Sequence, residues 1–266
     1  LLEKIPVSYD YYKKAFNNVH KEFCNGNSFL LNLTFPTEIE INLTLKEIFE
    51  YSIAKYKLLY EDKFVVFSPE TFVIIKDNII SSYPMKGTID AGIPDAYNII
   101  LQDEKEFAEH ITIVDLIRND IGIISKNVYV EKFRYIDLIK THEKSLYQVS
   151  SKICGELATG WNNNIGDILY SLLPAGSITG APKKKTVEII KSIENYERGY
   201  YTGIMGYYDN GYLESGVMIR FIENIDNKLF FKSGGGLTIY SDVEKEYNEL
   251  LEKVYVPIIR VSKDQR

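Results

Sequence analysis

The chain has 266 residues, of which 45% are hydrophobic and 13% aromatic, enough to bury a sizeable core in one large domain or two small ones. A formal net charge of −6 at pH 7 gives no general attraction to nucleic acid or to acidic membranes. No apolar run approaches the ~18 residues of a spanning helix, and Cys24 and Cys154 form no metal-ligand spacing. We therefore expect a cytoplasmic protein that binds neither nucleic acid nor membrane.

Helical and strand-like patterns are mixed along the whole chain, and the strands come in runs joined by short turns. Asn210-Gly211 and Asp226-Asn227 are strong hairpin signals. No repeat or linker separates the patterns, so they predict a single α+β domain over residues 1–266. In chain order, the sequence predicts a helix over 9–23, a strand over 29–34, a helix over 45–58, strands over 64–67, 72–75 and 79–83, a helix over 104–118, strands over 128–130, 133–136 and 147–157, a helix over 187–193, strands over 203–208, 216–221 and 228–232, and a helix over 244–253.

The segment PAGSITGAPK, residues 174–183, combines glycines, small hydroxyl residues and prolines just before a predicted helix. A loop that opens a helix presents free backbone N–H groups, which favour an anion, and Lys183 to Lys185 add positive charge. An ordinary helix-entry turn with solvated lysines is the alternative. The segment does not match the phosphate-binding pattern G-x-x-x-x-G-K-[ST].

Three carboxylates are candidate ligands of a hard cation. Glu246 and Glu249 lie three residues apart on a predicted helix, with Lys253 four residues further on, and therefore share one face. Glu109, from another predicted helix, could join them around Mg²⁺, which takes oxygen ligands and keeps waters. The alternative is a set of solvent-facing charges that pair along their own helices.

Two further residues could act in catalysis. Lys86 lies at a predicted strand end beside Pro84, where partial burial would allow it to act as a nucleophile. Glu70 follows Ser68-Pro69 at a strand break and could be a general acid. Exposed turn residues are the alternative for both.

Together these features resemble the chorismate-utilising enzymes, a family that includes component I of anthranilate synthase and of aminodeoxychorismate synthase, and the isochorismate and salicylate synthases. The order of the matching segments is the same, and they span nearly the whole chain. The matches are GNSFLLNLT at 26–34, SPE at 68–70, PMKGT at 84–88, Glu109 with VDLIRNDIG at 114–122, residues 151–157, PAGSITGAPK at 174–183, RGYYTG at 198–203, Ile219-Arg220, the three glycines at 234–236, and SDVEKEYNELLEK at 241–253.

Three positions distinguish the members of this family. The P-x-K-G-T form around Lys86 resembles aminodeoxychorismate synthases, in which this lysine is the covalent nucleophile, whereas anthranilate synthases usually carry a small residue there. Leu30 stands where isochorismate and salicylate synthases have the lysine that activates water. Gln148 stands where anthranilate synthases have a histidine. The resemblance thus implies aminodeoxychorismate synthase component I, which acts in para-aminobenzoate and folate synthesis.

The resemblance also assigns roles to the candidate residues. Lys86 would attack chorismate while Glu70 protonates the departing hydroxyl, and Mg²⁺ held by Glu109, Glu246 and Glu249 would bind the ring carboxylate. The expected substrate contacts are Thr88, Ser177, Thr179, Tyr201, Arg220, Gly234, Gly235, Gly236 and Lys253.

The fold implied by the family is two stacked, mostly antiparallel sheets flanked by helices. The N-terminal region of longer members is missing here, so we expect no tryptophan site. Ammonia would come from a separate glutamine amidotransferase subunit. Two alternatives stay open, namely anthranilate synthase component I and a non-catalytic module that binds chorismate or docks a partner.

Overall fold

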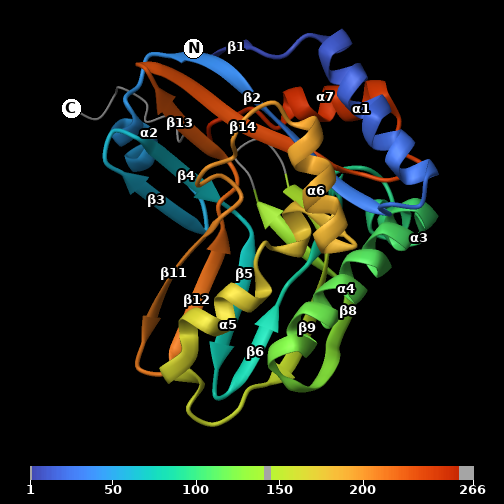
Figure 1. Ribbon diagram of the computed structural model, residues 1–266, viewed down its shortest axis with the longest axis vertical. Helices are drawn as coiled ribbons and strands as arrows, with labels where there is room; N and C mark the ends of the chain where they lie inside the picture. The colour runs from blue at the N-terminus through green and yellow to red at the C-terminus, as the bar shows by residue number, and fades with distance from the viewer. Residues whose placement is uncertain (1, 141–144, 258–266) are drawn as a thin grey trace. The chain divides into compact units, whose positions relative to one another are not determined.

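The computed structural model describes residues 2–140 and 145–257. These residues form two compact units, each assembled from segments that lie far apart in the sequence. Unit 1 takes its residues from 1–70, 178–205 and 216–266, and unit 2 from 71–177 and 206–215. One antiparallel sheet with helices packed against it forms the frame of each unit, as expected for the fold class (Figure 1).

The sheet of unit 1 runs in the order β1-β2-β14-β13-β4-β3, and the short strand β10 also pairs with β2. The long pairing of β2 with β14 brings together residues from the two ends of the chain, with Gly235 opposite Leu33. The strands are β1 (Leu2–Ile5), β2 (Leu30–Ile41), β3 (Tyr56–Tyr60), β4 (Phe64–Ser68), β10 (Gly180–Ala181), β13 (Phe221–Ile225) and β14 (Lys228–Leu237).

Three helices of unit 1, α1 (Tyr9–Cys24), α6 (Lys183–Ile193) and α7 (Val243–Glu252), lie beside β2 and β14 (Figure 1). The apolar face of α1 recurs at helical spacing, with Tyr12, Phe16, Val19 and Phe23 buried. It packs on apolar side chains of β2 in one core cluster. The packing of α7 against β14 places the carboxylates of α7 near the glycines of that strand.

The predicted helix over 45–58 is too long. The helix α2 (Leu45–Tyr51) begins with a capping box formed by Thr44 and Glu47 and ends at Ser52. Residues 56–60 form β3 instead, paired with β4. A short apolar run cannot be assigned to helix or strand by its own pattern, and the pairing with β4 decides it.

The sheet of unit 2 runs in the order β11-β12-β5-β6-β9-β7, and β8 pairs along β9. The helix α4 packs against β7, β8 and β9, and Figure 1 shows it beside β8 and β9. The elements are β5 (Thr71–Lys76), β6 (Ile79–Ser82), β7 (Met85–Asp90), α3 (Ala96–Gln102), α4 (Glu104–Ile124), β8 (Lys126–Lys140), β9 (Ser145–Glu156), α5 (Ile165–Leu172), β11 (Ile204–Asp209) and β12 (Tyr212–Val217).

Two strand predictions in this sheet need correction. The strand predicted over 216–221 is wrong at both ends. The tight turn at Asn210-Gly211 returns the chain at once, so β12 starts at Tyr212. It ends at Val217, and Phe221 already belongs to β13. The two strands predicted over 128–130 and 133–136 are one strand, β8, whose register against β9 shifts several times. Such bulges interrupt the alternation of side chains, so a long strand reads as two short ones.

Gly180 allows the loop at 174–183 to reach the sheet of unit 1. Its backbone has φ 137°, and a Cβ atom there would lie 1.8 Å from the Leu30 carbonyl oxygen. We expect Gly180→Ala to lower the free energy of unfolding by more than about 2 kcal/mol in urea denaturation. The matched control is Gly122→Ala on α4, where a Cβ would meet nothing within 4 Å. This control should gain about 0.5–1 kcal/mol, and equal stability of the two variants would contradict the prediction.

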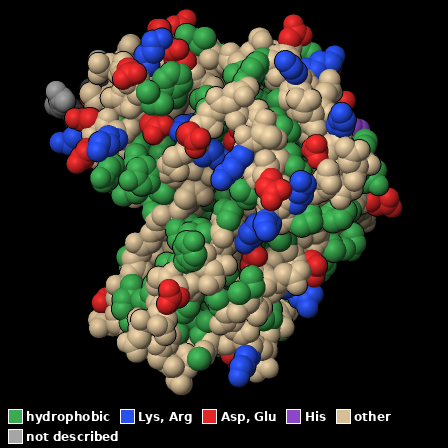
Figure 2. Space-filling view, in the orientation of Figure 1, with side chains coloured by type: hydrophobic (Ala, Val, Ile, Leu, Met, Phe, Trp, Pro, Cys, Tyr) green, Lys and Arg blue, Asp and Glu red, His purple; other side chains and the backbone are tan. Residues whose placement is uncertain are grey.

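Charged side chains of both signs lie on the surface (Figure 2). On the face seen in Figure 2, basic and acidic side chains are interspersed, so no broad field of one sign covers it. Across residues 2–140 and 145–257, no helix combines the length and apolar character needed to cross a membrane.

Candidate functional site

Lys86 lies in an irregular stretch of β7. The ladder pairs Met85 with Ser150 and then Thr88 with Gln148, so β7 carries one residue more than β9 between these pairs. Such a bulge re-aims the side chains of the extra residues. Gly87 accommodates it with φ 83°. The P-M-K-G-T segment therefore forms a kink in the strand that changes the direction of the lysine.

The lysine contacts a carboxylate of α4. Lys86 Nζ donates to Glu109 Oε2 over 2.8 Å, and the two side chains are 25% and 10% exposed. Because both side chains are largely buried, solvent screens this ion pair less than it screens one on the surface. For nucleophilic attack, Lys86 would have to give up its proton and leave Glu109.

His110, which follows Glu109 on α4, was not singled out from the sequence. It is fully buried, and its Nε2 lies 2.7 Å from Ser151 Oγ. Burial, together with the positive charges of Arg134 and Lys86, lowers the pKa of His110 to about 4, so the ring is neutral. A signal was available, because His110 interrupts the apolar stripe of α4 that continues through Ile113 and Ile117.

In unit 1, Glu246 and Glu249 converge on one glycine of β14. A Cβ atom at Gly235 would lie 3.3 Å from Glu246 Oε2 and 3.9 Å from Glu249 Oε1. Lys253 Nζ lies 2.5 Å from Glu249 Oε1 and donates to the Gly234 carbonyl over 2.9 Å. Glu246 is 9% exposed and accepts a hydrogen bond from Ser241. The three side chains therefore share one face of α7, as their spacing predicts, and they meet beside the glycines of β14.

This donor set suits Mg²⁺ on chemical grounds. Two carboxylates on a glycine-lined surface offer hard oxygen ligands, and Mg²⁺ in proteins is generally held by one or two carboxylates together with waters and substrate oxygens. The field of these carboxylates also reaches Tyr12. Burial is the main cause that raises the pKa of Tyr12, and the negative charges of Glu246 and Glu249 raise it further. Within the described part of the chain, no three His, Cys, Asp or Glu side chains are gathered as a ready-made metal site. Glu109 belongs to unit 2, so the metal assignment stays a prediction.

We expect Glu246→Gln to weaken Mg²⁺ binding at least about tenfold in calorimetric titration, because a neutral amide replaces a carboxylate ligand. Glu252→Gln is the matched control, since Glu252 is an exposed carboxylate on the same helix. It should bind Mg²⁺ as the parent protein does. If both variants bind Mg²⁺ equally well, the assignment of Glu246 is wrong.

Arg220, Tyr201 and Glu70 form a second group in unit 1. Burial raises the pKa of Tyr201, and the charges of Arg220 and Glu70 are among those that act on it, so its hydroxyl stays a donor. Arg220 adopts φ 54°, its Nε is buried with no hydrogen-bond partner among the described residues, and its guanidinium stands over Tyr255. Strained backbone and an unsatisfied buried donor commonly mark a binding site.

The remaining predicted contacts lie in both units. Thr179 is buried, and its carbonyl accepts a hydrogen bond from the Asn32 backbone N–H in β2. Ser177 and Thr88 belong to unit 2, where Thr88 is exposed and pairs with Gln148. Their substrate contacts stay predictions.

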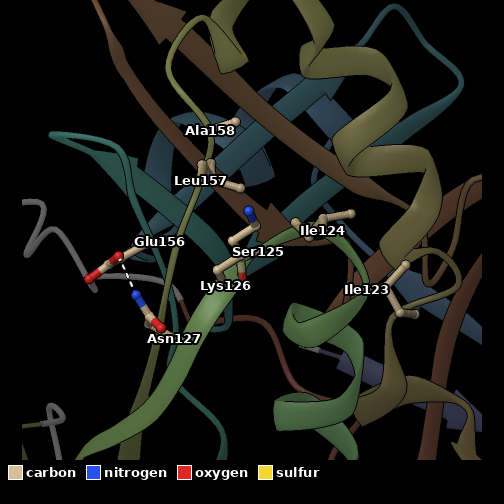
Figure 3. Close-up of a pocket in the computed structure, with 8 residues that line it drawn as sticks. All are labelled: Ile123, Ile124, Ser125, Lys126, Asn127, Glu156, Leu157 and Ala158. Carbon is tan, nitrogen blue, oxygen red and sulfur yellow. Dashed lines mark hydrogen bonds between the residues drawn. The ribbon is translucent and has the colours of Figure 1, made fainter.

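A separate pocket of about 360 Å³ lies in unit 2 where α4 passes into β8 (Figure 3). Its only ionisable side chains are those of Lys126 and Glu156, and Asn127 donates to Glu156 over 2.7 Å. None of the residues predicted for the site lines this pocket. The lining residues are Ile123, Ile124, Ser125, Lys126, Asn127, Glu156, Leu157 and Ala158.

The chain belongs to the chorismate binding enzyme family, whose model matches residues 2–258. A Haemophilus influenzae protein named as PabA-like is 56% identical over 96% of this chain and 78% of its own length. Aminodeoxychorismate synthase component 1 of Bacillus subtilis is 30% identical over 94% of this chain. The crystal structure of anthranilate synthase component I from Streptococcus pneumoniae superposes with a TM-score of 0.81 and 26% identity over 95% of this chain. This chain spans 55% of the Bacillus subtilis protein and 58% of the Streptococcus pneumoniae chain.

Proposed function

We propose that this protein is an aminodeoxychorismate synthase component I that converts chorismate and ammonia into 4-amino-4-deoxychorismate. The observation that carries the proposal is Lys86, set on a strand bulge and paired at 2.8 Å with Glu109. Family membership supports chorismate as the substrate, and the Bacillus subtilis relative supports this particular reaction. The product would serve para-aminobenzoate and folate synthesis in the cytoplasm.

The proposed reaction has two displacements. The Lys86 amine forms a bond to ring C2 while the bond from C4 to its hydroxyl breaks, and Glu70 gives that hydroxyl the proton with which it leaves as water. Ammonia then forms a bond to C4, and the bond between C2 and Lys86 breaks, which returns the amine. The ammonia would come from a glutamine amidotransferase partner or from free ammonium.

Charged groups would hold the substrate, which is a dianion. Arg220 would pair with the enolpyruvyl carboxylate, since its planar guanidinium suits bidentate binding. The metal ion would neutralise the ring carboxylate, and Glu109, Glu246 and Glu249 would be its protein ligands. Thr88, Ser177, Thr179, Tyr201, Lys253 and the backbone of Gly234, Gly235 and Gly236 would complete the contacts.

Anthranilate synthase component I is the second candidate, because the Streptococcus pneumoniae structure of that name shares the fold of this chain. Product identity separates the two candidates. The protein would be incubated with chorismate, Mg²⁺ and ammonium, and the products separated by chromatography and mass. We expect 4-amino-4-deoxychorismate, whereas anthranilate and pyruvate would support the second candidate. Binding of chorismate without any turnover would instead support a non-catalytic module.

A further inference from the structure

His110 is a buried polar residue that the proposed reaction does not use. Its ring lies edge-on to Phe133, and Nε2 is 2.7 Å from Ser151 Oγ. The other ring nitrogen, Nδ1, is buried with no partner among the described residues. A polar ring that is left half satisfied costs stability compared with an apolar side chain of similar size. Packing alone therefore gives no reason for a histidine at this position.

The hydrogen bond between His110 and Ser151 is linked to the start of β7, the strand that carries Lys86. Ser151 is fully buried, and its hydroxyl also accepts from the Arg134 backbone N–H over 2.9 Å. Its own backbone N–H donates to the Pro84 carbonyl over 3.0 Å, two residues before Lys86. Ser151 therefore fixes the chain at the point where the bulge of β7 begins.

His110 also sits next to Glu109 on α4, the carboxylate that pairs with Lys86. The contact between His110 and Ser151 thus joins α4, which carries the carboxylate, to β9, and Ser151 in turn bonds the residue before β7, the strand of the lysine. We propose that His110 is a positioning residue that, through Ser151 and Pro84, sets the direction of Lys86 relative to Glu109. The importance of this role for catalysis rests on the function proposed above.

The chain supplies an internal reference for measuring the position of Lys86. The side chain of Lys152 is also 25% exposed, and its ammonium group pairs with Glu131 over 2.7 Å. The extent of acetylation by acetic anhydride, read by peptide mass mapping, gives the ratio of Lys86 to Lys152 modification. No chorismate is needed, so this ratio reports the lysine's position whatever reaction the protein performs.

We expect His110→Leu to raise the ratio of Lys86 to Lys152 acetylation at least threefold, because a misdirected lysine loses the protection of Glu109. In the turnover assay the same variant should lose about 10–100-fold in kcat with little change in KM for chorismate, since a small misplacement affects reaction more than binding. His110→Gln should restore both values, because its amide Nε2 can take the place of the ring nitrogen toward Ser151.

Ser151→Ala removes the same contact from the other side and should change the acetylation ratio and kcat as His110→Leu does. This second variant keeps the proposal testable if His110→Leu does not fold. Ser215→Ala is the matched control, because Ser215 is a buried serine of the same sheet whose hydroxyl bonds the Val73 backbone. It should leave the acetylation ratio and kcat unchanged.

An unchanged acetylation ratio in both His110→Leu and Ser151→Ala would overturn the positioning role. So would a failure of His110→Gln to restore it. If the ratio shifts as expected while the product is anthranilate, His110 positions Lys86 and the proposed function is wrong. If 4-amino-4-deoxychorismate is made and neither ratio nor kcat responds to these variants, the proposed function stands and the positioning role is wrong.

Discussion

Lys86→Arg is expected to fold, to keep an ion pair with Glu109, and to form no covalent adduct with chorismate. An arginine carries the same charge, but its guanidinium stays protonated and cannot act as a nucleophile at neutral pH. We expect turnover to fall at least about 1,000-fold, as on removal of a covalent nucleophile. Intact-protein mass spectrometry during turnover should show a ring adduct on the parent protein and none on this variant.

Lys152→Arg is the control for this experiment, since it changes a lysine of equal exposure in a similar ion pair. It should keep both the adduct and the activity. Normal turnover by Lys86→Arg would make the lysine a bystander and would favour anthranilate synthase chemistry. This outcome is separable from unfolding, because the charge pair with Glu109 is retained.

The largest expected effect on stability belongs to Arg198. Its guanidinium pairs with both carboxylate oxygens of Glu194, and it also donates to the backbone carbonyls of Ile178 and Asn32. The side chain of Glu194 is 2% exposed and also accepts from Thr34. We expect Arg198→Met to lower the free energy of unfolding by about 3–5 kcal/mol, because it leaves a buried carboxylate without its countercharge.

Urea denaturation measures this loss, and the exposed pair between Lys185 and Glu188 supplies the control. Lys185→Met should change the free energy of unfolding by less than about 1 kcal/mol, as is usual for solvent-exposed ion pairs. A similar small change for Arg198→Met would mean that the buried carboxylate is stabilised by its other hydrogen bonds alone.

Most helices could be predicted from the sequence because their signals are local. The helix α1 shows this clearly, since its buried face recurs at helical spacing and Ser8 caps its start. Strand ends were less predictable, as β14 illustrates. It continues through Gly234, Gly235 and Gly236, residues that disfavour strands by themselves. The pairing of β14 with β2 overrides that local preference, and nothing near the glycines in sequence announces it.

The residues of the candidate site can be predicted from sequence motifs, but a motif does not show which residues contact one another. The grouping of Glu246, Glu249 and Lys253 follows from helical spacing alone. The pairing of Lys86 with Glu109 does not, because it depends on a bulge between two strands and on how α4 packs over them. For the same reason, the sequence marks His110 as a break in an apolar stripe but gives no sign of the serine that it contacts.

The discontinuous make-up of the two units has a consequence for biosynthesis of the chain. Unit 2 needs the hairpin of β11 and β12, and unit 1 needs β13, β14 and α7, and all of these elements are synthesised after residue 203. Among the described residues, β2 pairs with β1, β10 and β14, so its apolar side chains Leu31, Leu33 and Phe35 await β14 as the strand that completes their sheet. Closing such distant pairs is entropically costly and slow. The nascent chain therefore exposes an aggregation-prone strand until residues 228–237 have been made, and we expect its recovery in folded form to depend on chaperones.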